Sequence, residues 1–219
     1  CTWYGVSRFD GYTFKNFSTT PGDFSPLAHH RFISVSEDAN GHLWFTTYNL
    51  HVYRLNRYTE QFEDVVSLID GLDSNHYRTL FCRHDRRGGT WVAVAGVGAI
   101  RFEDAADESP VRVTAFHTCD ELGGDVTALY LDARGGTWLA SSGGGLHYLP
   151  ADADTLRVLC QSEAPGFDFA ADSTHVYCLM PSERDRRYGD RTPRWRQFAA
   201  DGHHGRHGAP AHLCRQPHG

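Results

Sequence analysis

Tryptophan recurs in this chain at one fixed interval, and that interval is the strongest constraint on what the chain can fold into. Trp44, Trp91 and Trp138 are separated by 47 residues and again by 47 residues. Each ends the same phrase, in which Asp, two residues, Gly and two further residues precede the Trp: DANGHLW, DRRGGTW and DARGGTW. Self-similarity at a period of roughly 20 to 50 residues predicts a repeat architecture.

A second marker lies 10 residues after each of these tryptophans. It is a short apolar phrase around Arg54, Arg101 and Tyr148, with the sequences HVYRL, GAIRF and GLHYL. An earlier copy, GVSRF, places Arg8 at the same point, 46 residues before Arg54. We therefore expect four repeats, the first of which opens with its front half missing.

Within one repeat, short apolar runs alternate with turn residues. In the repeat that begins at residue 32, these runs cover residues 32–37, 43–47, 51–55 and 61–66. The intervening phrases are typical of turns, because Asp can bond to its own backbone and Gly supplies a positive φ. Four strands in roughly 40 to 50 residues are the content of one propeller blade. The period then predicts that residues 32–66, 79–116 and 126–160 each form a four-stranded antiparallel sheet.

The predicted fold class is all-β, a β-propeller fragment of about four blades with the first incomplete. Asp and Gly of each phrase would form the hairpin turn between the first two strands. Each marker Trp would supply apolar surface where neighbouring blades pack. A helical period of about 3.6 residues does not compete over any useful length.

Charge divides the chain near residue 180. Residues 1–180 carry 13 basic and 23 acidic side chains, whereas residues 181–219 carry 8 basic and 4 acidic ones. Val176–Met180 (VYCLM) is similar to the first strand of a further repeat, but Ser182, Asp185 and Tyr188 then stand where Asp, Gly and Trp should follow. We predict propeller blades over 1–180. Over 181–219 we expect either a degenerate blade or a disordered or frame-shifted tail.

Composition and motifs exclude several classes of function. The net charge of −6 and the lack of a basic stripe give no reason to expect nucleic acid. No metalloprotease helix motif, nucleophile elbow, phosphate-binding loop or dinucleotide fingerprint is present. We therefore expect this segment not to be an enzyme, and assign no catalytic, cofactor-binding or metal-binding residue.

The cysteines and the N-terminus leave the cellular compartment open. Six cysteines, none in a Cys-x-x-Cys spacing, stand at positions 1, 82, 119, 160, 178 and 214. Cys82 and Cys178 are expected to be buried, and a disulfide is permitted in an oxidising compartment without the spacing naming a pair. No signal peptide or membrane span is visible. Cys1 invites a lipoprotein interpretation, which the repeat register disfavours.

At this point the phrases SEDANGHLWFTTYN, VYRLNRYTEQF and GLDSN resemble the two-component regulator propeller repeat. The opening WYGVSRFDGYTFKNFS resembles the first blade of bacterial hybrid two-component sensors. The resemblance covers residues 1 to about 180. It departs from the family where Gly-Thr after the second strand is Thr46-Thr47, Ala93-Val94 or Ala140-Ser141, and where the acidic pair is intact only at Glu37-Asp38.

The resemblance implies a periplasmic sensor region of an inner-membrane protein, followed by a transmembrane helix and a histidine kinase that are not in this chain. It implies an oligosaccharide ligand, the remaining blades and the kinase as partners, and a homodimer in the full-length protein. The alternatives are an extracellular propeller enzyme of the streptogramin-lyase type and a protein-interaction propeller. A paired acid and base on loop ends would favour the enzyme.

Several motifs allow both a structural and a functional interpretation. The Asp-x-x-Gly phrases invite a calcium site, but Arg stands where oxygen ligands would be needed in two copies, which favours turns. LGGDV (Leu122–Val126) superficially resembles a cyclic-dinucleotide synthase signature, and we expect a loop between blades. Three tail histidines could hold a metal loosely, although artefact or disorder is preferred: His203, His204 and His207.

Aromatic residues near the expected turns are the one signal for a ligand. Sugars stack on aromatic faces while their hydroxyls bond to polar neighbours. Packing between blades is the preferred interpretation, so the ligand-binding residues stay unknown. The residues concerned are Trp3, Tyr4, Tyr48, His76 and Tyr77.

Overall fold

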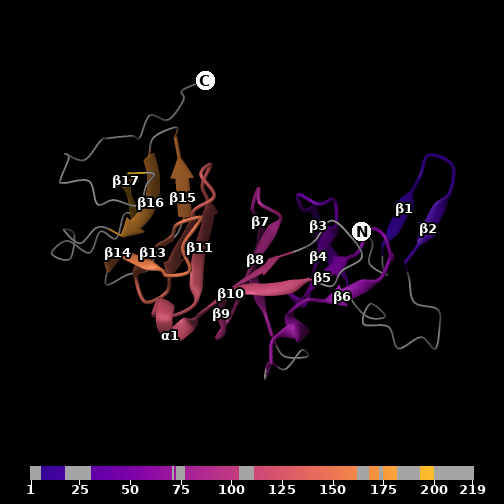
Figure 1. Cartoon of the computed structure of the whole chain (residues 1–219), viewed down its shortest axis with the longest axis horizontal. Helices are drawn as coiled ribbons and strands as arrows, with labels where there is room; N and C mark the ends of the chain where they lie inside the picture. Colours follow the sequence, from indigo (N-terminus) through magenta and orange to yellow (C-terminus); the bar gives the residue numbers. More distant parts are fainter. Residues whose placement is uncertain are drawn as a thin grey trace.

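The computed structural model describes residues 6–17, 31–70, 72, 77–103, 111–161, 168–172, 175–181 and 193–199. A short hairpin, β1 (Ser7–Phe9) and β2 (Phe14–Asn16), precedes a succession of antiparallel sheets. The sheets stand side by side in an open row rather than a closed ring over the described part of the chain (Figure 1). The prediction of an all-β propeller fragment is confirmed.

Three of the sheets have four strands each, joined in chain order. The first contains β3 (Phe32–Glu37), β4 (Leu43–Thr47), β5 (Val52–Leu55) and β6 (Phe62–Asp64). The second contains β7 (Thr79–His84), β8 (Gly89–Val94), β9 (Gly98–Glu103) and β10 (Arg112–Thr118). The third contains β11 (Val126–Leu131), β12 (Thr137–Ser141), β13 (Gly145–Leu149) and β14 (Arg157–Gln161). The three predicted sheets are thus confirmed.

Short helical turns interrupt the strands at two places in the described part of the chain. A 3-10 turn, η1 (Val66–Leu68), follows β6, so the strand expected over 61–66 ends at Asp64. The Asp64 carboxylate accepts a hydrogen bond from the Val66 backbone N–H at 3.2 Å, which turns the chain out of the sheet. A single-turn helix, α1 (Cys119–Leu122), lies between the second and third sheets. Gly123 and Gly124 follow it at positive φ, so LGGDV is the expected loop between blades.

A fourth sheet contains β15 (Asp168–Ala171), β16 (His175–Pro181) and β17 (Pro193–Ala199). The expectation that Val176–Met180 is a first strand is wrong, because β15 precedes β16 in the sheet. Ala170 pairs with Tyr177, as Tyr130 pairs with Trp138 in the third sheet. Asp172 follows Asp132 by 40 residues. This repeat is shorter than the 47 residues of the earlier ones. A constant spacing of 47 residues therefore points to positions beyond the Asp172 turn.

The expected division at residue 180 stays a prediction. β17 lies inside the segment for which a degenerate blade or a tail was expected, and it pairs with β16 from His175↔Ala199 to Pro181↔Pro193. Residues 182–192 and 200–219, including the three tail histidines, lie outside the described residues.

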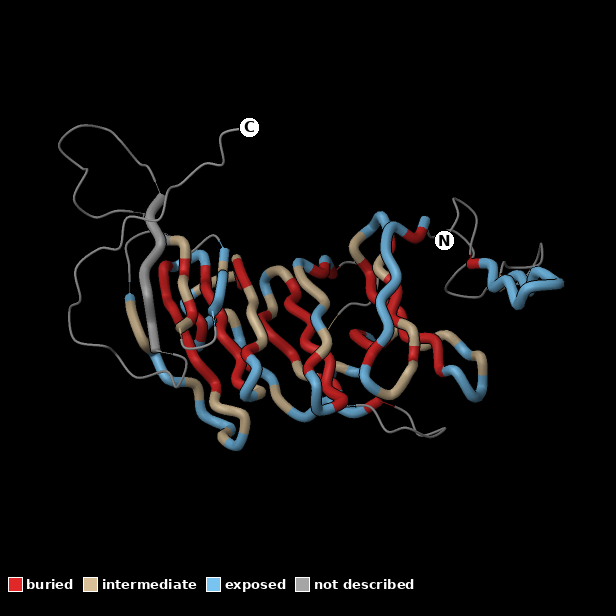
Figure 2. The backbone as a smooth tube through the Cα atoms, turned by 90° about the horizontal axis from the view of Figure 1, so that it is seen from above, coloured by how far each residue is buried: buried red, intermediate tan, exposed pale blue. Residues whose placement is uncertain are grey.

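Each marker Trp is buried between its own sheet and the next one. Trp44 packs in a cluster with Ile100 and Phe102 of the second sheet, and Trp91 in one with Leu139 of the third. Trp138 packs in a cluster with Val176 and Cys178 of the fourth sheet. Figure 2 shows the buried residues concentrated in the sheets, with hairpin β1–β2 exposed. The predicted role of the tryptophans at blade interfaces is confirmed.

The Asp of each repeated turn accepts hydrogen bonds from backbone N–H groups of its own hairpin. In the first sheet, Asp38 Oδ1 accepts from the backbone N–H groups of Asn40 and His42, and Oδ2 accepts from the Trp44 indole at 2.7 Å. In the third, Asp132 Oδ2 accepts from the Trp138 indole at 3.0 Å. The carboxylates serve the turns, as predicted. The indole bond links Asp and Trp directly in the first and third sheets.

Candidate functional site

One end of the sheets forms a continuous rim. There, the turn between the second and third strands lies beside the start of the first strand of the same sheet. The backbone N–H groups of Tyr48, Ala95 and Ser142 donate to the carbonyls of Arg31, Arg78 and Asp125 at 2.6, 2.9 and 2.7 Å. We define the rim as these bonded turns and strand starts, namely residues 31, 48–50, 78, 95–97, 125 and 142–144.

Hydrogen bonds join the rim from sheet to sheet. The Thr79 N–H donates to the Leu50 carbonyl at 2.7 Å, and the Gly96 N–H donates to Asp125 Oδ1 at 2.6 Å. Leu50 has a φ of 65°, in the left-handed region that a non-glycine residue rarely occupies. Such strain costs roughly 1–3 kcal/mol and persists only where surrounding contacts fix the backbone. The turn of Tyr48 is therefore held in one conformation.

A β-bulge lies in the first strand of each four-stranded sheet, just inside the rim. The pairing shifts between Phe32 and Ser34, between Thr79 and Phe81, and between Val126 and Ala128. The skipped residues are Ile33, Leu80 and Thr127. Bulges re-aim side chains near binding sites, and here they leave Ile33 56% exposed and Leu80 37% exposed.

The structure separates the aromatic residues that the sequence could not distinguish. Tyr48 lies on the rim and is 67% exposed. Tyr77 is buried between the first two sheets, where its hydroxyl donates to Asp64 Oδ1 at 2.9 Å and its ring stacks on His51 at 4.3 Å. Burial, reinforced by the Asp64 charge, raises the pKa of Tyr77. Packing between blades is thus confirmed for Tyr77. Trp3, Tyr4 and His76 lie outside the described residues.

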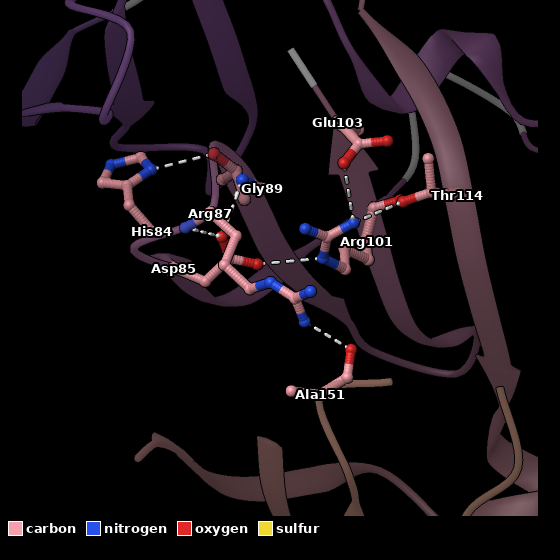
Figure 3. A network of polar contacts seen from close by, with 9 residues as sticks. His84, Asp85, Arg87, Gly89, Arg101, Glu103, Thr114 and Ala151 are labelled. Atoms are coloured by element: carbon pink, nitrogen blue, oxygen red, sulfur yellow. Dashed lines mark hydrogen bonds and ion pairs between the residues drawn. The ribbon is translucent and has the colours of Figure 1, made fainter. Parts of the chain in front are cut away.

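A polar network at the opposite end of the sheets ties the second sheet together (Figure 3). Asp85 Oδ1 accepts from the backbone N–H groups of Arg87 and Gly89, and Oδ2 accepts from Arg101 Nε at 2.9 Å. Arg101 also donates to Thr114 Oγ1 at 2.9 Å, and the Arg87 guanidinium reaches the carbonyl of Ala151 in the next repeat. Burial raises the pKa of Asp85, but these hydrogen bonds outweigh it and hold the pKa below its ordinary value.

The second sequence marker lies opposite the Trp on the third strand. Trp44 pairs with Arg54, Trp91 with Arg101 and Trp138 with Tyr148. Arg54 is fully buried and forms an ion pair with Glu63 at 2.7 Å. Tyr148 packs on Trp138, with ring centroids 4.7 Å apart. The residues at this end of the sheets therefore stabilise the fold by holding neighbouring strands together.

Two histidines that the sequence did not single out are buried near α1. His117 Nδ1 bonds to the Glu121 carboxylate at 3.2 Å, and His147 Nε2 donates to the Leu122 carbonyl at 3.1 Å. His117 Nε2 and His147 Nδ1 are buried and have no hydrogen-bond partner among the residues that the structure describes. Burial lowers the pKa of His147, outweighing the Leu122 carbonyl and the Glu121 charge that raise it. Among the described residues, no three His, Cys, Asp or Glu side chains form a metal-binding group.

We expect the chain to lose stability as the pH falls from about 7.5 to about 5. His147 has an ordinary pKa of 6.5 that is lowered in the fold, and burial also lowers the pKa of His51 and His84. Below pH 6.5 the unfolded chain therefore binds more protons than the folded one, which favours unfolding. Urea denaturation across this range should show a falling midpoint, with a weaker dependence in His147→Gln. An unchanged dependence in that variant would exclude His147 as a contributor.

Two of the described thiols have low reactivity. Burial raises the pKa of Cys82 to about 12, and burial together with a hydrogen bond to Asp125 raises that of Cys119 to about 11. Since the thiolate is the reactive form, neither is a nucleophile at neutral pH. Cys82, Cys119, Cys160 and Cys178 form no disulfide with one another in the described part of the chain. Cys178 is buried as expected, whereas Cys82 is only half-buried, because it lies on the first strand, at the edge of the second sheet. Cys1 and Cys214 lie outside the described residues.

Comparison with known proteins supports the family resemblance. Residues 26–49 match the model of the two component regulator propeller. No curated protein gives a significant match to the sequence. The description of the matched family confirms the recognition made from the SEDANGHLWFTTYN phrase.

Solved structures confirm the propeller fold. The extracellular domain of a putative hybrid two component system from B. thetaiotaomicron is similar at 12% identity with a TM-score of 0.53, over 81% of this chain and 24% of that one. The β-propeller domain of Cps50 (Swd1) from Myceliophteria thermophila gives 12% identity and a TM-score of 0.51, over 76% and 55%. The tricorn protease gives 13% and 0.54, over 87% and 18%.

The chain spans about a quarter of the extracellular domain that it resembles, since the shared part covers 24% of that domain. In the described part of the chain, no helix combines the length and the apolar character that a membrane crossing requires. Proteins of different function share this fold, so the fold by itself assigns none of them.

Proposed function

We propose that this chain is a ligand-sensing segment from the extracytoplasmic region of a hybrid two-component sensor, and that its ligand is a carbohydrate. The observation that carries the proposal is the match of residues 26–49 to the two component regulator propeller. The similar fold of an extracellular domain from a putative hybrid two component system supports it.

The geometry supports a binding segment over a catalytic one. The acidic residues of the repeat are engaged in structure, since Asp38, Asp85 and Asp132 accept hydrogen bonds from their own turns. The rim instead offers an exposed Tyr, apolar side chains and arginines on a fixed backbone. Such a surface can hold a sugar without activating water for attack.

Signalling would follow from binding energy. A ligand that binds one arrangement of the blades more tightly than another shifts the population toward it, by as much as the two affinities differ. The readout would be a kinase on the same full-length protein, acting in a homodimer. The arginines lie at the starts of β3 and β7, and a backbone hydrogen bond from Thr79 to Leu50 joins the turn of Tyr48 to the second sheet, so a bound ligand would favour one spacing of these sheets.

Isothermal titration calorimetry of the chain against a panel of oligosaccharides tests the proposal, with chromatographic analysis of the same mixtures for cleavage products. We expect binding of at least one oligosaccharide and its recovery intact. Far-UV circular dichroism would first establish that the protein is folded. Cleavage of the bound oligosaccharide would favour an enzyme, and a folded protein that binds no member of the panel would contradict carbohydrate sensing.

A further inference from the structure

The rim of the first two sheets has a composition that the third sheet lacks. Each of the first two sheets starts with an arginine followed two residues later by an exposed apolar residue of the bulge: Arg31 and Ile33, then Arg78 and Leu80. In the third sheet, the same positions are Asp125 and Thr127. The exposed Tyr48 lies between the two arginine-bearing strand starts. We call these five residues, 31, 33, 48, 78 and 80, the Tyr48 patch.

Backbone hydrogen bonds hold the patch together. The Tyr48 N–H bonds to the Arg31 carbonyl at 2.6 Å, and two residues later the Leu50 carbonyl accepts from the Thr79 N–H at 2.7 Å. The turn of Tyr48 is therefore clamped between the starts of β3 and β7. Two strand starts that are 47 residues apart in sequence thus lie against the one turn that carries Tyr48.

The arginine of the second sheet is available to a ligand. Arg78 is exposed, and its side chain makes no hydrogen bond or ion pair with any residue that the structure describes. Other arginines in the repeats have structural partners, as Arg54 has with Glu63 and Arg101 has with Asp85. The Thr79–Leu50 backbone hydrogen bond thus brings the strand start that carries the exposed Arg78 next to the turn that carries the exposed Tyr48.

We propose that the Tyr48 patch binds an anionic oligosaccharide, one that carries uronate carboxylates or sulfate groups. This inference rests on the proposed function and adds the chemical class of the ligand. The tyrosine ring and the apolar bulge residues suit the C–H face of a sugar ring. The guanidinium groups suit a carboxylate or sulfate, which arginine binds through two parallel hydrogen bonds.

The charge of the rest of the chain sharpens the inference. With a net charge of −6, the protein repels anions at long range, so anion binding requires a local cationic site. Asp125 restricts that site to the first two sheets, because its carboxylate is fixed on the rim of the third by the Gly96 N–H at 2.6 Å. The acidic groups of the ligand would therefore lie over β3 and β7.

Titration calorimetry with three probes tests the proposal: tetragalacturonate, a sulfated glucosamine–uronate tetrasaccharide and neutral cellotetraose. We expect an anionic probe to bind, and to bind more weakly as NaCl rises from about 50 to about 300 mM. Arg78→Gln should weaken binding at least about tenfold, with Arg78→Lys intermediate because it keeps the charge and loses the paired hydrogen bonds. Tyr48→Ala should weaken it similarly, whereas Tyr48→Phe keeps the stacking ring.

Arg134→Gln is the matched control, since this exposed arginine lies in the turn at the opposite end of the third sheet. It should leave affinity unchanged, and circular dichroism should show all variants folded because the substituted side chains are exposed. Binding of cellotetraose alone, unaffected by Arg78→Gln, would overturn the anionic ligand and leave carbohydrate sensing intact. Binding of none of the three probes by the folded protein would count against both.

Discussion

Replacing Trp138 with alanine will destabilise the protein by about 3–5 kcal/mol, the range for emptying a large buried aromatic site. Trp138 is fully buried and packs with Leu146, Val176 and Cys178, so its ring fills the space between the third and fourth sheets. Its indole N–H also donates to Asp132 Oδ2 at 3.0 Å. The substitution thus opens a cavity and removes a hydrogen bond from a buried carboxylate.

Urea denaturation followed by circular dichroism measures the effect, and two variants separate its parts. Trp138→Phe keeps most of the apolar volume and loses the donor, so we expect a loss of about 1–3 kcal/mol from the unsatisfied carboxylate oxygen. Tyr12→Ala alters a side chain that is 94% exposed and should change stability by less than about 0.5 kcal/mol. A loss in Trp138→Ala no larger than in Tyr12→Ala would refute the proposed role of the Trp at the blade interface.

Gly98→Ala will be far more damaging than Gly96→Ala, although the two glycines are only two residues apart. Gly98 has a φ of 137°, and a Cβ there would collide with the backbone carbonyl of His117 on the neighbouring strand. Gly96 has a φ of 71°, and a Cβ there would meet no atom within 4 Å. We expect Gly96→Ala to cost about 1 kcal/mol from backbone strain alone, and Gly98→Ala to exceed about 3 kcal/mol.

The informative quantity is the difference in unfolding free energy between these two variants. Both remove one glycine and add one methyl group, at positions two residues apart, so their effects on the unfolded chain are alike. Denaturation midpoints therefore report the collision in the folded state. Equal losses in the two variants would mean that β9 and β10 separate easily, contrary to the close pairing of Gly98 with Thr118.

The sequence by itself determined the architecture of the blades. The phrase that ends in Trp44, Trp91 and Trp138 is local, and its turn and strands follow from residues a few positions apart. A local pattern repeated at constant spacing predicts the same unit each time, since the same short-range preferences act on it. For this reason the three sheets and their Asp-Gly turns were predicted with nearly correct bounds.

The tertiary structure decided what spacing alone could not. Tyr177 takes the position of the Trp in the fourth sheet, and its hydroxyl donates to Asp172 at 2.8 Å. Because this repeat is shorter than 47 residues, a constant spacing does not place Tyr177 in line with the three tryptophans. Similarly, Asp85 bonds to Arg101 through the oxygen that bonds to the indole in the first and third sheets, which depends on a partner two strands away.

The candidate site shows most clearly which features the sequence determines and which depend on the tertiary structure. Tyr48 and Tyr77 both stand beside turns in the sequence, yet one is 67% exposed and the other 4%. Their fates differ because Tyr77 enters the space between two sheets, whereas Tyr48 lies on a turn at the rim. Arg31 and Arg78 were always 47 residues apart in the sequence. They became parts of one surface because stacking brings the starts of β3 and β7 to the two sides of a single turn.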